Sequence, residues 1–225
     1  MKTSLNLTEK QSRQSRNPFQ SAFKRLFDIA GSAACLVLLT PVYAGVAASI
    51  LAEDGRPVLF KQKRTGKDGV TFDIYKFRSM KVQQASGTGK TADDKYNWPD
   101  RVPDDFVFKP ASLDNPNITK AGKFIRKYSL DELPQLYNVL KGDMSLIGPR
   151  PEIIEITRCY DAQQRERLTV KPGITGWAQV NGRSSMNHGE KIKHDLYYVN
   201  NTSLTLDIKI IIKTATQVLL GKNAS

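Results

Sequence analysis

Apolar residues are concentrated in one uninterrupted run, residues 29–52, in which none of the 24 positions carries a charge. A helix of about 20 apolar residues is long enough to cross the ~30 Å hydrocarbon core of a bilayer. Pro41 stands in the middle of this run, where a proline removes a helical hydrogen bond and clashes with the preceding turn. Each half of about 12 residues then extends only about 18 Å. The pattern therefore predicts a membrane-associated helix that is broken or bent at Pro41.

Basic residues flank both ends of this run, with Lys24 and Arg25 before it and Arg56 and Lys61 after it. A spanning helix usually has more Lys and Arg on its cytoplasmic side, and no such asymmetry is present here. A re-entrant helix enters one leaflet and returns, with both ends at the anionic cytoplasmic face, and it agrees with the break and with the flanks. A spanning helix and a buried core helix are the alternatives.

Polar and apolar residues alternate over 57–80, on either side of a Gly66-Lys67-Asp68-Gly69 turn, and this pattern predicts a β-hairpin. Residues 81–116 hold few aliphatic side chains and many Gly, Asp and Pro residues, which indicates a surface loop. The Gly/Pro-rich stretch 171–177 is also expected to be a loop. Helical patterns predict helices from Lys120 onward, over 133–140, over 153–168 and over 204–220. The last of these fits either a membrane surface or ordinary core packing.

Composition narrows the class of protein. The 225 residues are enough for one domain, or one domain with an anchor. A hydrophobic share of 40% and a mean hydropathy of −0.42 exclude a polytopic membrane protein and a wholly disordered chain. Two cysteines are too few for a disulfide framework. The net charge of +12 lies mainly in segments around the apolar run and around 120–150, which favours anionic lipid or a phosphorylated substrate.

The candidate chemistry lies in the dipeptide Asp131-Glu132. A structural explanation is a helix capping box, Ser129-x-x-Glu132, with acids favoured in the first helical turn. Pro134 points to another arrangement, because a proline prefers the first helical position and would leave both acids just ahead of outward-pointing amide groups. Carboxylates near Arg126 and later Arg150 suit a divalent metal with a diphosphate, and an aspartate can also act as a nucleophile. Both interpretations stay open at this level.

Five segments in a fixed order carry a wider resemblance: FKRLFDIAGS, PVLFKQKRTGKDGVTFDIYKFRSM, IRKYSLDELPQLYNVLKGDMSLIGPRP, KPGITGWAQVNGR and DLYYVNNTSLTLDIKIIIKT. The chain resembles the bacterial sugar transferase family, the monotopic polyprenyl-phosphate phosphoglycosyltransferases. The resemblance covers about residues 22–220 and corresponds to the minimal catalytic unit of that family.

The resemblance implies that Asp131 attacks the β-phosphate of a UDP-sugar, expels UMP and carries a covalent sugar phosphate. Undecaprenyl phosphate then accepts the phosphosugar, and the product starts a bacterial glycan such as an exopolysaccharide. Glu132 is implied to bind Mg²⁺. Arg126 and Arg150 are implied to bind phosphate, and Asp207 matches a family acid near the active site. Gln179, Asn181 and Arg183 in GWAQVNGR are further candidates for contact with the nucleotide or the sugar.

The same resemblance implies an α+β monotopic membrane protein at the cytoplasmic face of the bacterial inner membrane, with a Thr40-Pro41 helix break and amphipathic interfacial helices. We expect a flexible polar N-terminus over 1–21, a re-entrant helix over 22–55 and a mainly helical catalytic domain over 56–225. Anionic lipids are expected partners, and a homo-oligomer is compatible with the sequence. The Thr40 hydroxyl is expected to bond a carbonyl one turn back and assist the bend.

Residues 83–105 form extra polar length relative to the shortest relatives. A lid over the nucleotide, an oligomer contact and a passive loop are possible, and we expect a passive loop. Two other functions compete with the transferase. A nucleic-acid-binding protein is disfavoured because no such motif is recognisable and the charge clusters beside the apolar run, so no nucleic acid partner is expected. A catalytically inactive membrane scaffold is disfavoured by the intact Asp131-Glu132 pair.

Overall fold

The computed structural model contains helices of varied length and short strands, and it describes residues 18–81, 96–108, 114–182 and 186–219. The helices are α2 (Pro18–Leu38), α3 (Thr40–Asp54), α5 (Lys120–Lys127), α6 (Gln135–Lys141), α7 (Ile154–Arg158), α8 (Ala162–Arg165), α9 (Trp177–Asn181), α10 (His188–Asn200) and α11 (Leu204–Leu219). The strands are β1 (Leu59–Thr65), β2 (Thr71–Phe77), β3 (Ser145–Ile147) and β4 (Gly173–Thr175). This mixture confirms the predicted α+β class. Residues 1–17 and 82–95, with most of the expected N-terminus and part of the extra loop, lie outside the described residues.

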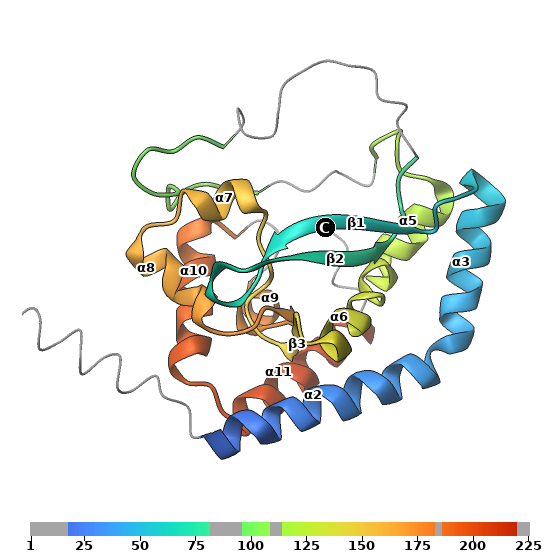
Figure 1. Cartoon of the computed structure of the whole chain (residues 1–225). Helices are drawn as coiled ribbons and strands as arrows, with labels where there is room; N and C mark the ends of the chain where they lie inside the picture. The colour runs from blue at the N-terminus through green and yellow to red at the C-terminus, as the bar shows by residue number, and fades with distance from the viewer. Residues whose placement is uncertain (1–17, 82–95, 109–113, 183–185, 220–225) are drawn as a thin grey trace, which may run out of the picture.

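The apolar run forms two helices that meet at a bend, as predicted. Helix α2 ends at Leu38, α3 begins at Thr40, and the pair is bent by 60°. The Thr40 hydroxyl donates to the carbonyl of Leu36 at 2.9 Å, which confirms its expected bond one turn back. Figure 1 shows α2 along one edge of the molecule and α3 turning up beside the domain. Among the described residues, no single helix has the length and hydropathy to cross a bilayer, whereas this bent pair does when both halves are counted together.

Polar contacts hold the inner side of α2 against the domain. Arg25 donates to the carbonyls of Val139 and Leu140 at the end of α6, at 2.6 and 2.8 Å. The carbonyl end of a helix carries partial negative charge, so a cation is favourable there. The buried Asp28 carboxylate accepts from the Ser145 hydroxyl and the Leu146 amide, both at 3.0 Å. The first half of α2 is therefore fixed to β3 and α6.

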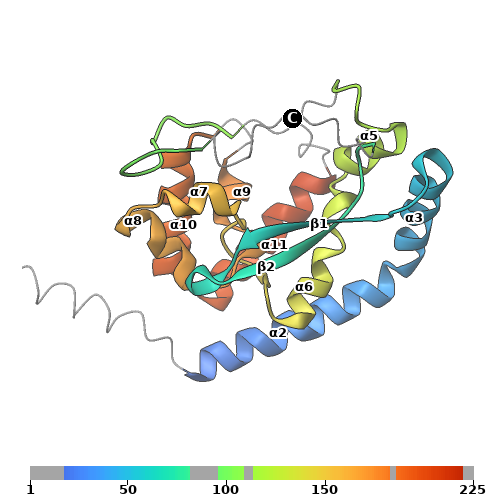
Figure 2. The same cartoon turned by 45° about the horizontal axis from the view of Figure 1, so that its top comes forward.

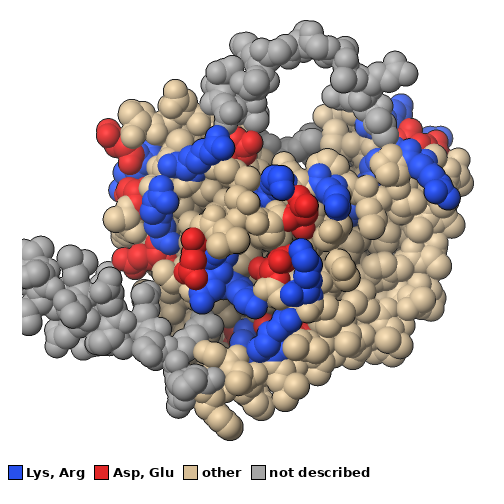
Figure 3. Space-filling model, viewed as in Figure 1, with Lys and Arg blue, Asp and Glu red and all other residues tan. Residues whose placement is uncertain are grey.

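The outer side of the bent pair is apolar and exposed. Val37 and Leu38, at the bend, are 73% and 76% exposed. A buried core helix, one of the alternatives for the apolar run, is therefore wrong. Figure 3 shows the same edge as an uncharged surface, while Lys and Arg gather over the hairpin and the loops beside it.

The predicted hairpin is present. Strands β1 and β2 pair antiparallel from Leu59 opposite Phe77 to Thr65 opposite Thr71, and the turn η1 (Lys67–Gly69) joins them. A second sheet was not predicted: β3 and β4 pair in parallel, and β4 lies within the expected loop 171–177. Such a pairing joins segments that are far apart in the chain, so a local sequence pattern does not predict it.

The contact between the β3 and β4 segments is too close for side chains. A Cβ added to Gly173 would lie 2.0 Å from the backbone nitrogen of Gly148, and one added to Gly176 would lie 2.1 Å from the Gly148 carbonyl oxygen. Glycine is required where two backbones approach this closely. These glycines let the loop after β3 lie flat on β4.

The predicted continuous helix over 153–168 is wrong. The segment forms α7, α8 and the 3-10 turn η3 (Glu166–Thr169). Asp161 accepts a hydrogen bond from the Gln164 amide in a complete capping box, so a new helix begins where the amphipathic pattern predicted continuity. Helix α10 was missed, although Asn187 and Glu190 form the same kind of box and mark its start.

Residues 96–105, the described part of the extra length, are packed into the protein. Val102 is fully buried, and its backbone N–H and carbonyl both bond to the Gln164 side chain. The Trp98 ring lies 4.8 Å from that of Phe106, just after this stretch, in the same apolar cluster. These residues therefore belong to the core over α7 and α10, and the choice of a passive loop over a lid or an oligomer contact stays a prediction.

The helix predicted over 204–220 is confirmed as α11. One of its sides packs in the core, which was one of the two interpretations. Leu206 and Ile210 are buried in the domain core, whereas Ile208 and Ile212 are 46% and 61% exposed on the other side. Figure 2 shows α11 behind the β1–β2 hairpin, and its first turn is tied to α2 by the Lys24–Asp207 pair at 2.7 Å. The exposed apolar side of α11 is a surface that a membrane could cover, which was the other interpretation.

A glycine substitution tests the close contact of β3 with β4. We expect Gly173→Ala to lower the free energy of unfolding by about 1–3 kcal/mol through overpacking. The matched control is Gly45→Ala in α3, where an added Cβ meets nothing within 4 Å and a helical alanine is favoured. Thermal unfolding in detergent compares the two, and equal melting temperatures would contradict the close contact.

Candidate active site

The acidic pair lies on a short turn between α5 and α6. Asp131 and Glu132 belong to the 3-10 turn η2 (Leu130–Glu132), and their side chains are each 16% exposed. Ser129 has a left-handed backbone, φ 55°, and its side chain makes no capping hydrogen bond. The capping-box interpretation is therefore wrong. Helix α6 starts after Pro134, so both acids precede it, as the alternative predicted.

Three backbone amides near the acidic pair are already bonded within the chain. The N–H groups of Glu132, Leu133 and Leu136 donate to the carbonyls of Ser129, Leu130 and Leu133 respectively. These three amides are not free to bind an anion, so the cationic side chains around the pair are the stronger candidates for that role.

Two cations contact the pair. Lys76 of β2 places its Nζ 2.9 Å from Glu132 Oε1 and 3.8 Å from Asp131 Oδ2. Arg150 donates from both terminal nitrogens to Glu132, to Oε2 at 3.2 Å and to Oε1 by a shorter bond. Two parallel bonds of this kind fix both geometry and charge. Both oxygens of Glu132 are thus bound to cations, whereas the ion pair that Asp131 makes with Lys76 is longer, at 3.8 Å.

The two carboxylates differ in electrostatics as well as in contacts. Burial and the neighbouring Glu132 carboxylate raise the pKa of Asp131, although Lys76, Arg150 and Arg126 oppose this shift. Burial also acts on Glu132, but Arg150 and Lys76 overcome it and hold the pKa of Glu132 far below its usual range. Adjacent acids whose environments push their pKa values apart are typical of divided chemical roles.

Lys76 was missed in the sequence, although a signal was present. Phe72, Ile74 and Lys76 share one face of β2 because alternate residues of a strand point the same way. Phe72 and Ile74 are buried. A lysine at the next position on an otherwise apolar, inward face indicates a charged partner there.

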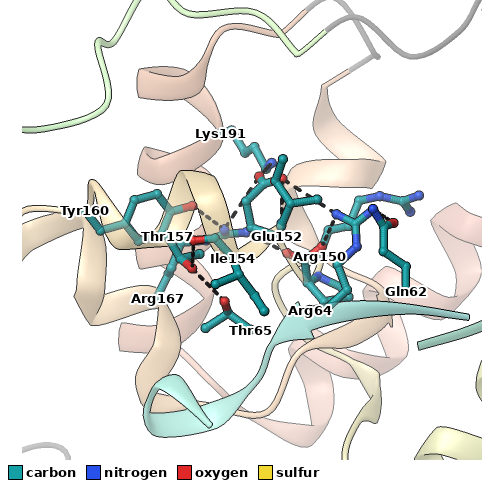
Figure 4. A network of polar contacts seen from close by, with 12 residues as sticks. Gln62, Arg64, Thr65, Arg150, Glu152, Ile154, Thr157, Tyr160, Arg167 and Lys191 are labelled. Atoms are coloured by element: carbon teal, nitrogen blue, oxygen red, sulfur yellow. Dashed lines mark hydrogen bonds and ion pairs between the residues drawn. The ribbon is translucent and has the colours of Figure 1, made fainter. Parts of the chain in front are cut away.

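A buried network holds the backbone at Arg150 (Figure 4). Arg167 is 1% exposed and donates from a terminal nitrogen to the Arg150 carbonyl at 2.8 Å. The same guanidinium bonds Asp195 at 2.6 Å and the Tyr160 hydroxyl at 2.7 Å. The Arg150 side chain therefore extends toward Glu132 from a loop whose backbone is held in place by Arg167.

Glu152 is the acidic centre of this network. It pairs with Lys191 of α10 by a short bond, and Arg64 and Arg167 lie 4.0 Å from its carboxylate. Burial alone would raise the pKa of Glu152, but Lys191, Arg167 and Arg64 lower it to about 2. Glu152 is therefore ionised at neutral pH and ties β1 to α10 beneath the loop.

Of the other predicted site residues, Arg126 lies near the acidic pair and Asp207 is bonded elsewhere. Arg126 on α5 is near enough to Asp131 to lower the pKa of its carboxyl. Asp207 is 1% exposed and pairs with Lys24 at 2.7 Å and with the Tyr198 hydroxyl at 2.9 Å. These bonds connect α11 to α2 and α10 and do not join Asp207 to the acidic pair.

The residues of the 177–183 segment also differ among themselves. The Gln179 amide is buried and has no hydrogen-bond partner within the described residues, so it retains free bonding capacity. Asn181 accepts from Lys213 at 2.6 Å and donates to the Trp177 carbonyl. Arg183 lies outside the described residues.

The acidic pair is compatible with a magnesium ion. No group of three or more His, Cys, Asp or Glu side chains with metal-binding geometry occurs in the described part of the chain. Mg²⁺ commonly uses one or two carboxylates together with substrate phosphate oxygens, and Asp131 with Glu132 meets that requirement. Lys76 and Arg150 already neutralise Glu132, so a cation there shares or replaces their contacts.

Comparison with known proteins supplies an independent finding. The bacterial sugar transferase family profile matches residues 19–221. The uncharacterized sugar transferase EpsL of Bacillus subtilis is 41% identical over 88% of this chain and 88% of its own length. The galactosyl transferase CpsE of Streptococcus agalactiae is 43% identical over 89% of this chain. A UDP-N-acetylgalactosamine-undecaprenyl-phosphate N-acetylgalactosaminephosphotransferase of Aeromonas hydrophila is 38% identical over 92%. The matches cover 43% and 46% of the latter two relatives.

The Glu152 network predicts a specific sensitivity to acid. The pKa of Glu152 falls from 4.5 to about 2 on folding. Its contribution to the free energy of unfolding is therefore fully present above pH 4.5 and is lost as the pH falls toward 2. We expect Lys191→Met to raise the pKa of Glu152 and to move the acid-unfolding midpoint to higher pH. Lys193→Met, an exposed lysine on the same helix, is the control. Denaturant titrations across this pH range measure both, and an unchanged midpoint in Lys191→Met contradicts the assignment.

Proposed function

Because the chain belongs to the bacterial sugar transferase family, we propose that it moves a sugar 1-phosphate from a UDP-sugar to undecaprenyl phosphate and so initiates a bacterial glycan. The chain is a transferase by its family. The name of the Aeromonas hydrophila relative includes undecaprenyl phosphate, which supports this acceptor here.

One observation carries the proposal: the adjacent carboxylates have different partners. Both oxygens of Glu132 are bonded to Arg150 and Lys76, while Asp131 is mostly buried and has one longer contact with Lys76. A poorly solvated carboxylate held beside cations is a better nucleophile than a hydrated one, and the cations attract an anionic substrate. This difference supports Asp131 as the nucleophile and Glu132 as the fixed partner.

The reaction then takes two steps. An Asp131 carboxylate oxygen attacks the β-phosphorus of the UDP-sugar, and the bond from that phosphorus to the bridging oxygen breaks, so that UMP leaves. The resulting sugar-phosphoryl aspartate is attacked at phosphorus by a phosphate oxygen of undecaprenyl phosphate. The bond between phosphorus and Asp131 breaks, which restores the carboxylate and releases the lipid diphosphate sugar. Such a scheme has ping-pong kinetics.

Side chains around the pair have matching roles. Arg126 and Arg150 approach Asp131 closely enough to affect its pKa and would bind phosphate oxygens, and Lys76 would stabilise the charge on the leaving UMP. Asp131 and Glu132 would hold Mg²⁺, which when bound neutralises diphosphate charge. The unsatisfied Gln179 amide is available to bond the nucleotide or the sugar.

The bent helix pair supports a position at one membrane leaflet. We propose that the exposed apolar sides of α2, α3 and α11 enter the cytoplasmic leaflet of the inner membrane, with anionic lipids around their basic flanks. A soluble donor and a lipid acceptor must meet at one site. A catalyst held on the membrane surface brings the acceptor phosphate to the level of the acidic pair.

The activity is tested by UMP release from a panel of UDP-sugars with undecaprenyl phosphate and Mg²⁺. We expect one or a few donors to react and Asp131→Asn to abolish UMP release and lipid product together. Asp68→Asn is the matched control, because Asp68 is an exposed acid in the hairpin turn and asparagine tolerates its left-handed backbone. Normal turnover by Asp131→Asn would contradict the covalent step. Failure of the wild type with every donor, despite a correctly folded protein, would favour an inactive scaffold.

Topology is tested separately by cysteine labelling in a variant without Cys35 and Cys159. Single cysteines at Gln20 and Lys67, both exposed, report the two sides of the bent pair. We expect both positions to react with an impermeant reagent only after the cytoplasmic face is opened. Labelling of one position in sealed cells would establish a spanning pair instead.

A further inference from the structure

Helix α3 touches the catalytic turn directly. The Tyr43 hydroxyl, two residues after Pro41, donates to the Leu133 carbonyl at 2.6 Å. Leu133 immediately follows Glu132. The Tyr43 ring also packs edge-on against Phe77 of β2, with 5.4 Å between centroids. A residue next to the helix bend is therefore bonded to the turn that carries both acids.

The rest of the inner face of α3 meets the elements around the same site. Val46 and Ile50 are buried with Ile125 of α5. At the end of the helix, the Glu53 carboxylate accepts from the backbone amides of Lys120 and Ala121, at 2.6 and 2.7 Å, and so caps the start of α5.

Asp54 pairs with Arg78, just after β2, at 2.8 Å. Helix α3 therefore contacts all three elements that carry Lys76, Arg126 and Asp131. Among these contacts, the Tyr43 hydroxyl supplies the hydrogen bond to the acidic turn.

The turn η2 depends on external support. It is one short 3-10 segment, and its preceding residue, Ser129, has a left-handed backbone. Segments of this kind have weak internal hydrogen bonding, so their position follows from neighbouring contacts. The Leu133 carbonyl accepts from the Leu136 amide and from Tyr43, which uses both of its lone pairs.

We propose that Tyr43 is a positioning residue for sugar-phosphate transfer: its hydroxyl holds the Leu133 carbonyl and thereby aligns Asp131 with the bent membrane helix. This inference rests on the proposed function. The bend at Pro41 sets where Tyr43 lies, and Tyr43 sets where the turn lies. The nucleophile is therefore placed relative to the bilayer through one hydrogen bond as well as through apolar packing.

Tyr43→Phe removes the hydroxyl and retains the ring. We expect kcat for UMP release to fall about tenfold, with KM for the UDP-sugar within about twofold, because alignment and not donor binding is lost. Ser49→Ala is the matched control: the Ser49 hydroxyl bonds only the Gly45 carbonyl within α3. We expect its kinetics to stay within twofold of the wild type.

A purely structural role is separated by single-turnover kinetics without the lipid acceptor. The amplitude of the UMP burst reports the folded fraction of the enzyme, and its rate constant reports the alignment of Asp131. We expect Tyr43→Phe to lower the rate constant and to keep the amplitude. Phe77→Leu, which removes the ring contact and keeps the hydroxyl, should lower stability and the amplitude and leave the rate constant near that of the wild type.

Amide hydrogen exchange over residues 130–133 provides a readout that does not need activity. We expect faster exchange there in Tyr43→Phe and none of this increase in Ser49→Ala. An inactive wild type with this exchange difference would overturn the proposed function and leave the positioning contact supported. An active wild type matched by Tyr43→Phe in burst rate constant and in exchange would overturn the positioning role. A Tyr43→Phe protein that does not fold would also overturn it, since the hydroxyl would then be structural.

Discussion

The rest of this structure depends on the charge pairing of Glu132 with Lys76 and Arg150. A buried carboxylate without partners would be protonated or would unfold its surroundings. Here two cations from separate segments hold it ionised, and they bring the hairpin and the loop after β3 to one turn. Asp131 makes a longer ion pair with Lys76, and the pKa values of these neighbouring acids are shifted in opposite directions.

Much of the remaining domain supports that pairing. Arg150 is held through its carbonyl by Arg167, which is neutralised by Asp195, and Glu152 joins Lys191 in the same layer. Buried ion pairs add little net stability, because desolvation opposes the attraction, but removal of one partner is costly. Such a network is therefore well suited to fix geometry. On the other side of the turn, α3 performs the corresponding task with apolar packing and one phenolic hydrogen bond.

Local patterns in the sequence predicted part of the site and missed the rest for a physical reason. The Asp131-Glu132 pair and Arg150 were found because their residue types suit phosphate chemistry and because their motifs resemble a known family. Lys76 was missed, since its importance depends on a strand face meeting a distant turn. Asp207 was placed among substrate-binding residues, yet its bonds to Lys24 and Tyr198 connect helices of the domain.

The sequence by itself determined the features that arise within a few residues of the chain. The bend at Pro41, the hairpin around its glycine turn and the amphipathic α11 follow from a missing N–H, from turn propensity and from periodicity. Only the tertiary structure decided the β3–β4 pairing and the partners of each carboxylate. Those features depend on backbone contact and charge neutralisation between distant segments. The contacts that stabilise these features form only when the chain folds, so a local sequence pattern does not predict them.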